Sequence, residues 1–123
     1  MPPGNAFVNS DPKDVKLANF GEVAVIRLNV RTGTYLVFGR VTIWNSYVDS
    51  QNASAKLTHS DGADIADRAD VRLAPDTRQV LYLQGTLIVK DSAMVDIRCA
   101  TYNGIVSQAS LFAIEVASPL LFM

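Results

Sequence analysis

Few residues in this chain are able to carry out chemistry, because it contains one histidine, His59, and one cysteine, Cys99. A nucleophile needs a neighbouring base, and a transition-metal site needs several nitrogen or sulfur ligands. Cys99 continues the apolar alternation of Val95 and Ile97, which predicts a buried structural thiol. His59 lies in a polar segment, which predicts a surface position. We therefore expect no catalytic centre, no metal site, no cofactor and no internal disulfide.

A polar segment over residues 59–70 carries an acidic residue at every third position. These residues are Asp61, Asp64, Asp67 and Asp70. Calcium binds carboxylate oxygens in flexible loops, but the spacing and the closing glutamate of an EF-hand are missing. Arg68 and Arg72 lie among the aspartates and neutralise their charge. The segment predicts a solvated loop, and a loop that binds a cation or another ligand is the alternative.

The overall composition excludes several kinds of partner. Apolar residues make up 49% of the 123 residues, which is enough for the core of one folded domain. The formal net charge is −1 and no basic run is present, so we expect no nucleic-acid partner. Apolar runs such as Tyr35–Gly39 are too short for membrane insertion. Residues 1–5 have no features of a secretory signal, which leaves three expectations for location: the cytosol, export without such a signal to act at a surface, or a mature or excised domain.

Short runs of β-branched and aromatic residues, separated by Gly, Asn, Asp and Pro, predict an all-β chain. No stretch keeps apolar residues at helical spacing across three turns. Eight main strands are expected near Ala6–Val8, Glu22–Val30, Thr34–Asn45, Ala53–Thr58, Val71–Leu73, Gln79–Val89, Met94–Tyr102 and Ser107–Ala117. Asn103-Gly104 is expected to form the turn before the last strand, because both residues accept a positive φ.

The expected strands are of two kinds, and the first kind alternates between apolar and polar residues. In the segment 22–30, one face carries Ala24, Ile26, Leu28 and Val30. The opposite face carries Arg27 and Asn29. Residues 53–58 and 94–102 alternate in the same way. Such strands form a sheet with one face in the core and one face in water.

The second kind of strand is apolar on both faces, as in residues 34–45, 79–89 and 107–117. A strand of this kind must be covered on both sides, and a chain this short has no helices to supply a second cover. We therefore predict a two-layer sandwich. Its inner sheet packs on the core with one face and on another subunit with the other face.

These strands resemble those of a known superfamily. Gly33-Thr34-Tyr35-Leu36-Val37-Phe38 resembles the G-x-Y-x-F strand of the tumour necrosis factor-like and complement-type globular heads. Ala109-Ser110-Leu111-Phe112-Ala113-Ile114 resembles their last strand, and residues 80–89 and 94–99 are similar to their paired sixth and seventh strands. The resemblance covers about residues 20–117. It implies an antiparallel jelly-roll β-sandwich whose third, sixth and last strands form the interface of a homotrimer.

The same resemblance sets the expected domain organisation. Residues 1–123 form a single jelly-roll domain with its core at about 20–117. An N-terminal strand and loop occupy residues 1–19, and a C-terminal tail occupies residues 118–123.

A closer similarity is to the bacterial tumour necrosis factor-like lectin domains that bind fucosylated glycans. It rests on the long sixth strand, a short hairpin and the closing A-S-L-x-A-I pattern at residues 109–114. In such domains the sugar lies between neighbouring subunits, held by hydroxyls and arginine. The similarity implies ligand-binding roles for Thr58 and Arg78. His59, in the same polar segment as Thr58, is a further candidate.

Aromatic residues with polar groups suit both sugar stacking and protein interfaces. Trp44 and Tyr82 lie within the strands of the inner sheet and are expected at an interface or in the core. Tyr102, like Tyr47, flanks a loop and is expected near a ligand.

The sequence therefore predicts a trimeric, non-catalytic binding module with a glycan as the candidate ligand. Its predicted site residues are Thr58, His59, Arg78 and Tyr102. The alternative is a structural or assembly protein, such as the trimeric head of a fibre or a decoration module, which needs only the trimer and its exposed loops. No sequence motif favours an enzyme.

Overall fold

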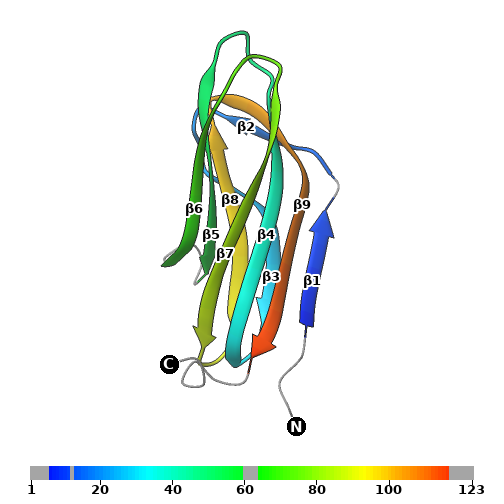
Figure 1. Cartoon of the computed structure of the whole chain (residues 1–123), viewed down its shortest axis with the longest axis vertical. Coiled ribbons are helices and arrows are strands. Elements are labelled where there is room, and N and C mark those ends of the chain that lie inside the picture. The colour runs from blue at the N-terminus through cyan, green and yellow to red at the C-terminus, as the bar shows by residue number, and fades with distance from the viewer. Residues whose placement is uncertain (1–5, 12, 60–63, 117–123) are drawn as a thin grey trace.

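A computed structural model describes residues 6–11, 13–59 and 64–116, which form nine antiparallel strands in two sheets (Figure 1). The strands are β1 (Ala6–Asp11), β2 (Val15–Ala18), β3 (Val23–Val30), β4 (Gly33–Asn45), β5 (Gln51–His59), β6 (Asp64–Leu73), β7 (Arg78–Val89), β8 (Ala93–Thr101) and β9 (Asn103–Val116). The described residues include no helix that is long and apolar enough to cross a membrane.

Sheet A has the strand order β1-β9-β4-β7, with β2 pairing with the first residues of β9. Sheet B has the order β3-β8-β5-β6 and packs against the back of sheet A (Figure 1). The three strands that the sequence makes apolar on both faces, β4, β7 and β9, lie side by side in sheet A. The three alternating strands, β3, β5 and β8, lie side by side in sheet B. The predicted jelly-roll sandwich and its division into two sheets are therefore confirmed.

The core fills the space between the sheets with side chains from both. Its largest buried side chains include Tyr35, Leu57, Ile97 and Leu111. Gly39, in the middle of β4, lets the sheets approach each other, because a Cβ atom there would lie 2.7 Å from Cδ1 of Ile97. Cys99 is fully buried, and this burial raises the pKa of its thiol to about 12. Its predicted structural role is confirmed.

Both long edges of the sandwich are closed by a side chain that reaches from one sheet to the other. At one edge, Nδ2 of Asn9 in β1 donates to the carbonyl of Arg27 in β3 at 2.7 Å. At the opposite edge, the amide of Gln84 in β7 donates to Oδ2 of Asp67 in β6 at 2.9 Å. Edge strands have unpaired backbone groups that can pair with another chain, and these two contacts use some of those groups within the molecule.

Residues 64–70 belong to strand β6 and His59 is the last residue of β5, so the prediction of a loop over 59–70 is wrong for these residues. Residues 60–63, with Asp61, lie outside the described residues. On this edge strand the charges pair with each other, since Arg68 donates to the Asp70 carboxylate at 2.8 and 3.0 Å. These hydrogen bonds lower the pKa of Asp70. The described residues contain no cluster of three or more His, Cys, Asp or Glu side chains arranged to hold a metal ion.

The chain passes from β8 to β9 without the turn predicted at Asn103-Gly104. The two strands lie in different sheets, so the connection crosses the sandwich at Tyr102 and no hairpin forms. Neither Asn103 nor Gly104 has a positive φ. Glycine is needed at 104 for space instead, because a Cβ atom would lie 2.8 Å from the Trp44 carbonyl oxygen. The segments 80–89 and 94–99 also lie in opposite sheets, as β7 and β8, and do not pair as predicted.

A β-bulge in β3 changes the predicted phase of its first residues. The register shifts between Ala24 and Ile26, so that Ala24 pairs with Arg98 while Val25 and Ile26 are both buried. One extra residue reverses the side on which the preceding residues point. Ala24 therefore does not share the inner face with Ile26, as the alternation predicted, whereas Val30 does. The predicted C-terminal tail over 118–123 lies outside the described residues.

Candidate functional site

The outer face of sheet A exposes large apolar side chains on four adjacent strands. We call this set the apolar face: Val8, Leu36, Phe38, Val80, Tyr82 and Ile88, with Phe112 and Ile114 half-buried among them. The strand register places Phe38 beside Phe112 and Leu36 beside Ile114, so the surface is continuous across β4 and β9. Tyr82 is the most open of these residues, with 71% of its surface exposed.

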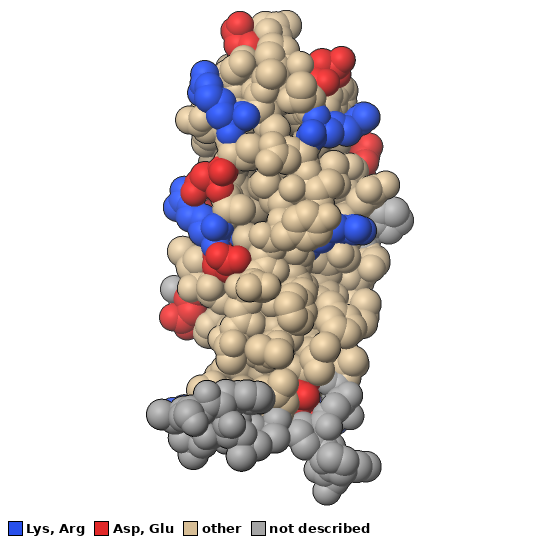
Figure 2. All heavy atoms as spheres, viewed as in Figure 1, with Lys and Arg blue, Asp and Glu red and all other residues tan. Residues whose placement is uncertain are grey.

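Charged side chains are nearly absent from the apolar face. Figure 2 shows this side of the molecule, and the middle and lower parts of its front are almost entirely uncharged. Arg40 is an exception within the face, where it lies between Tyr82 and Ser110. An antiparallel sheet that faces water normally carries polar residues on that side. The six exposed apolar side chains leave roughly 600 Å² open, the upper end of what a monomer usually exposes in one patch.

The outer face of sheet B has the opposite character and contains the predicted site residue Thr58. Thr58 is 1% exposed, and its hydroxyl donates to the Asp96 carboxylate, which is also buried. Arg98 donates to the same carboxylate at 3.1 Å, and Nε of Arg27 lies 3.9 Å from it. The Thr58 hydroxyl is thus part of an internal hydrogen-bond network. His59, the next residue, is half-buried with Nδ1 3.9 Å from the Asp64 carboxylate.

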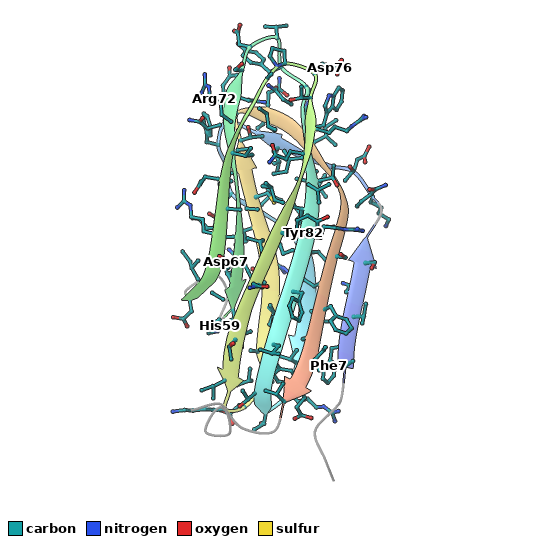
Figure 3. The ribbon with its side chains drawn as sticks, viewed as in Figure 1. Phe7, His59, Asp67, Arg72, Asp76 and Tyr82 are labelled. Atoms are coloured by element: carbon teal, nitrogen blue, oxygen red, sulfur yellow. The ribbon has the colours of Figure 1, made fainter. Side chains whose placement is uncertain are left out.

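The other two predicted site residues lie at the loop end, which is formed by residues 46–50, residues 74–77 and Tyr102. The guanidinium carbon of Arg78 lies 5.3 Å from the centre of the Trp44 ring, a cation–π contact. The Tyr102 ring packs edge-on against Tyr47, with ring centres 5.1 Å apart. Figure 3 shows His59 far from Asp76, which marks the loop end. Within one chain, Arg78 and Tyr102 therefore lie at one end, and Thr58 and His59 lie toward the other.

Asn45 joins the loops at this end through its fully buried side chain. Its amide group donates to the carbonyls of Asp49, Leu73 and Ala74 at 2.9–3.1 Å. Its Oδ1 atom accepts from the Tyr47 amide at 2.8 Å and from the Gln51 side chain at 2.6 Å. The loop end is therefore held by buried hydrogen bonds. Sequence reasoning missed Asn45, because nothing local distinguishes it from any polar residue at the end of a strand.

Phe20 was also missed by sequence reasoning. It lies in the tight turn between β2 and β3, and its ring centre is 6.0 Å from that of Tyr102. Together Tyr47, Tyr102 and Phe20 form an aromatic row at the loop end. The sequence does signal a turn here, since Asn19 and Gly21 flank Phe20, but it does not say which rings the turn brings together.

The two antiparallel sheets form a jelly-roll β-sandwich like that of tumour necrosis factor, which is the fold that the sequence resemblance implied. Among solved structures, the chain is similar to Eiger TNF from S. frugiperda, with a TM-score of 0.64, 12% identity and 94% of each chain covered. It is also similar to a chain in the structure of infectious bursal disease virus Gx strain, with a TM-score of 0.65, 12% identity and 94% of this chain covered. The infectious bursal virus-derived T=1 particles match with a TM-score of 0.62, 14% identity and 91% of this chain covered.

The chain spans 34% and 32% of the two viral chains and 94% of the Eiger chain. No family model and no curated protein matches the sequence. At these identities the similarity is one of fold, and a fold alone does not determine a function.

Proposed function

We propose that this chain is a non-catalytic assembly module that forms a homotrimer through the outer face of sheet A. The observation that carries the proposal is the continuous apolar face, which only Arg40 interrupts among the described residues. The outer face of sheet B instead carries Arg27, Lys56 and Arg98. Burying roughly 600 Å² of apolar surface contributes about 15 kcal/mol per copy before the cost of association. This area approaches the roughly 800 Å² per partner of a standard interface.

The closed edges of the sandwich support contact through the face rather than through strand pairing. Asn9 and Asp67 already bridge the two sheets at the edges where a second copy would add a strand. Three copies, rather than two, follow from the resemblance to tumour necrosis factor-like heads. One structural neighbour comes from infectious bursal virus-derived T=1 particles.

A non-catalytic role agrees with the positions of the two residues best suited to chemistry. Burial of Cys99 raises the pKa of its thiol to about 12, so the thiolate needed for nucleophilic attack does not form near neutral pH. His59 lies beside Asp64 and at a distance from Cys99, which faces the core.

The apolar face alone is sufficient for a structural or assembly role, as in the trimeric head of a fibre or a decoration module. Binding of a glycan at subunit boundaries by Thr58, His59, Arg78 and Tyr102 stays a prediction from the lectin resemblance. Arg78 and Tyr102 are exposed at the loop end and are accessible to a ligand, whereas the Thr58 hydroxyl is engaged by Asp96.

The test is the mass of the protein in solution, measured by light scattering after size-exclusion chromatography at micromolar concentration. The 13.3-kDa chain should elute at about 40 kDa as a trimer. Tyr82→Asp places a charge on the apolar face at a residue that is 71% exposed, so it should give a folded monomer. Asn29→Asp makes a comparable change at an exposed position of β3 in sheet B and should leave the trimer intact.

A wild-type mass near 13 kDa or 27 kDa would overturn the trimer. A Tyr82→Asp variant that keeps the wild-type mass would show that the copies meet through another surface.

A further inference from the structure

The outer face of sheet B contains a shallow hollow of about 500 Å³ beside the loop end. Ser54 in β5 and Ala100 in β8 are paired neighbours with small side chains, and they form its floor. Phe20, Asn52 and Arg72 also line it. Arg68 and Asp70 line it as an ion pair, in which the arginine neutralises the carboxylate. The volume is within the range of small-molecule sites in proteins. The hollow faces away from the apolar face, so it stays open when sheet A is covered.

Phe20 is held at the rim of the hollow in an unfavourable backbone conformation. Asn19 and Phe20 have φ values of 55° and 57°, and the Gly21 amide donates to the Ala18 carbonyl at 3.0 Å, which closes the turn. Two positive φ angles favour glycine or asparagine, and phenylalanine is a poor choice for the second position. Phe20 is also 56% exposed, and its contact with Tyr102 covers only part of it. Strained backbone conformations of this kind cluster at functional positions.

Arg72 brings a positive charge to the hollow without a carboxylate partner. Its Nη1 atom donates to Oδ1 of Asn52, a neutral group, at 3.0 Å. Within the described ranges no carboxylate lies at ion-pair distance from Arg72, whereas the neighbouring Arg68 is paired with Asp70. A guanidinium has five donors in a planar fork that matches a carboxylate. Arg72 therefore retains donors for an anionic group of a ligand.

The backbone of the floor favours a ligand that is recognised by side chains. The floor strand β5 is paired on both sides, with β6 and with β8, so its amides and carbonyls are used within the sheet. A peptide commonly binds through main-chain pairing at a free strand edge, which this floor does not offer. A sugar instead places hydroxyls against polar side chains and the apolar face of its ring against an aromatic side chain. Ser54, Asn52 and Phe20 supply these groups.

We propose that this hollow binds an acidic saccharide, whose ring packs on Phe20 and whose carboxylate is held by Arg72. Ser54 and Asn52 hydrogen-bond to its hydroxyls. The site lies within one chain and does not depend on the homotrimer, so the Tyr82→Asp variant should bind with the affinity of the wild-type protein.

The test is a titration of the full chain with oligosaccharides that contain uronic or sialic acid, each matched by a neutral counterpart of equal length. Binding is monitored by the changes in NMR chemical shift. Acidic members should bind at least tenfold more tightly than their neutral counterparts. Arg72→Gln should weaken the acidic ligands ten- to a hundredfold and leave the neutral ones unchanged. Arg31→Gln removes an exposed arginine at the opposite end of the molecule, where it lies 5.8 Å from the Phe7 ring centre, and should change nothing.

Phe20→Gly separates binding from folding. Glycine adopts a positive φ without strain, so the melting temperature should stay equal or rise while binding of every saccharide is lost. The proposal fails if no acidic saccharide binds, or if binding survives both Arg72→Gln and Phe20→Gly. It also fails if an acidic peptide of equal charge binds more tightly than the saccharides with the same dependence on both residues.

Discussion

Replacing Asn45 by leucine tests whether its side chain holds the loop end together. Leucine has a similar size but cannot hydrogen-bond, so five hydrogen bonds are lost. The Leu73 carbonyl is buried and costs about 1–3 kcal/mol when unsatisfied. The Gln51 side chain keeps its hydrogen bonds with Asn103, and the Ala74 carbonyl keeps those from Thr77, so these two groups cost less. The remaining two groups are partly open to water. We expect a loss of about 2–5 kcal/mol in the free energy of unfolding.

The assay is urea denaturation at fixed protein concentration, followed by circular dichroism and by the fluorescence of Trp44, the one tryptophan in the chain. Asn45→Asp serves as a second variant, because it keeps the acceptor for Tyr47 and Gln51 but turns a carboxylate toward three carbonyls. That environment raises the pKa of the new carboxyl above its unfolded value. The defect of Asn45→Asp should therefore shrink as the pH falls from 7 to 5. A loss below about 1 kcal/mol in Asn45→Leu would refute the role of the network.

Three further predictions concern the core and are read from urea denaturation. Ile26→Asp should unfold the protein, because it buries an unpaired charge. Arg27→Gln should lower the free energy of unfolding by less than about 1 kcal/mol, because Arg27 is exposed, and equal damage from both changes would contradict the orientation of β3. Because burial raises the pKa of the Cys99 thiol from 9.0 to about 12, the unfolded chain loses this proton first. As the pH rises between these values, the free energy of unfolding should fall by about 1.4 kcal/mol per pH unit. The Cys99→Ala variant should not show this fall. Gly39→Ala should lower the free energy of unfolding by about 1–3 kcal/mol, because the new methyl group clashes with Ile97. Adding Ile97→Val should recover part of this loss. If the effects of the two changes simply add, the clash is not the cause.

The division of strands between the sheets could be predicted because it depends on which faces are buried. Val95, Ile97 and Cys99 alternate with polar residues, since one face of β8 meets the core and the other meets water. Leu36 and Phe38 are apolar although they point away from the core, which marks β4 as a strand of another kind. The apolar or polar character of each strand face can be read from the sequence without knowing which strands pair, because it depends only on alternate residues.

The rest of the fold depends on contacts that a local pattern does not contain. Strand β6 has charged residues at an edge, where charge protects the strand from pairing with other chains, and its sequence therefore resembles a loop. The Asp67 carboxylate accepts a hydrogen bond from a backbone amide of the other sheet. The phase of Ala24 is set by a bulge, and the role of Gly104 is set by the carbonyl of Trp44.

The candidate sites show the same limit. Tyr102 and Tyr47 could be predicted beside loops, and the structure places their rings together at the loop end. Phe20 could not be predicted there, since its position depends on two positive φ angles and on the packing of distant segments. The lectin resemblance implies a ligand-binding role for Thr58, but its hydroxyl donates to the buried carboxylate of Asp96, which lies on a strand far along the chain.

The pairing of β1 with β9 gives the molecule two unlike poles. Ala6 pairs with Ile114, so the first and last described residues leave the sandwich together, at the end opposite to Tyr102 (Figure 1). A stalk, a shell or a fused label joined at either residue is therefore anchored at the same pole. The aromatic row and the hollow stay at the free pole, where neither attachment obstructs them. A short linker between Val116 and Ala6 would likewise close the chain into a ring without disturbing the loop end.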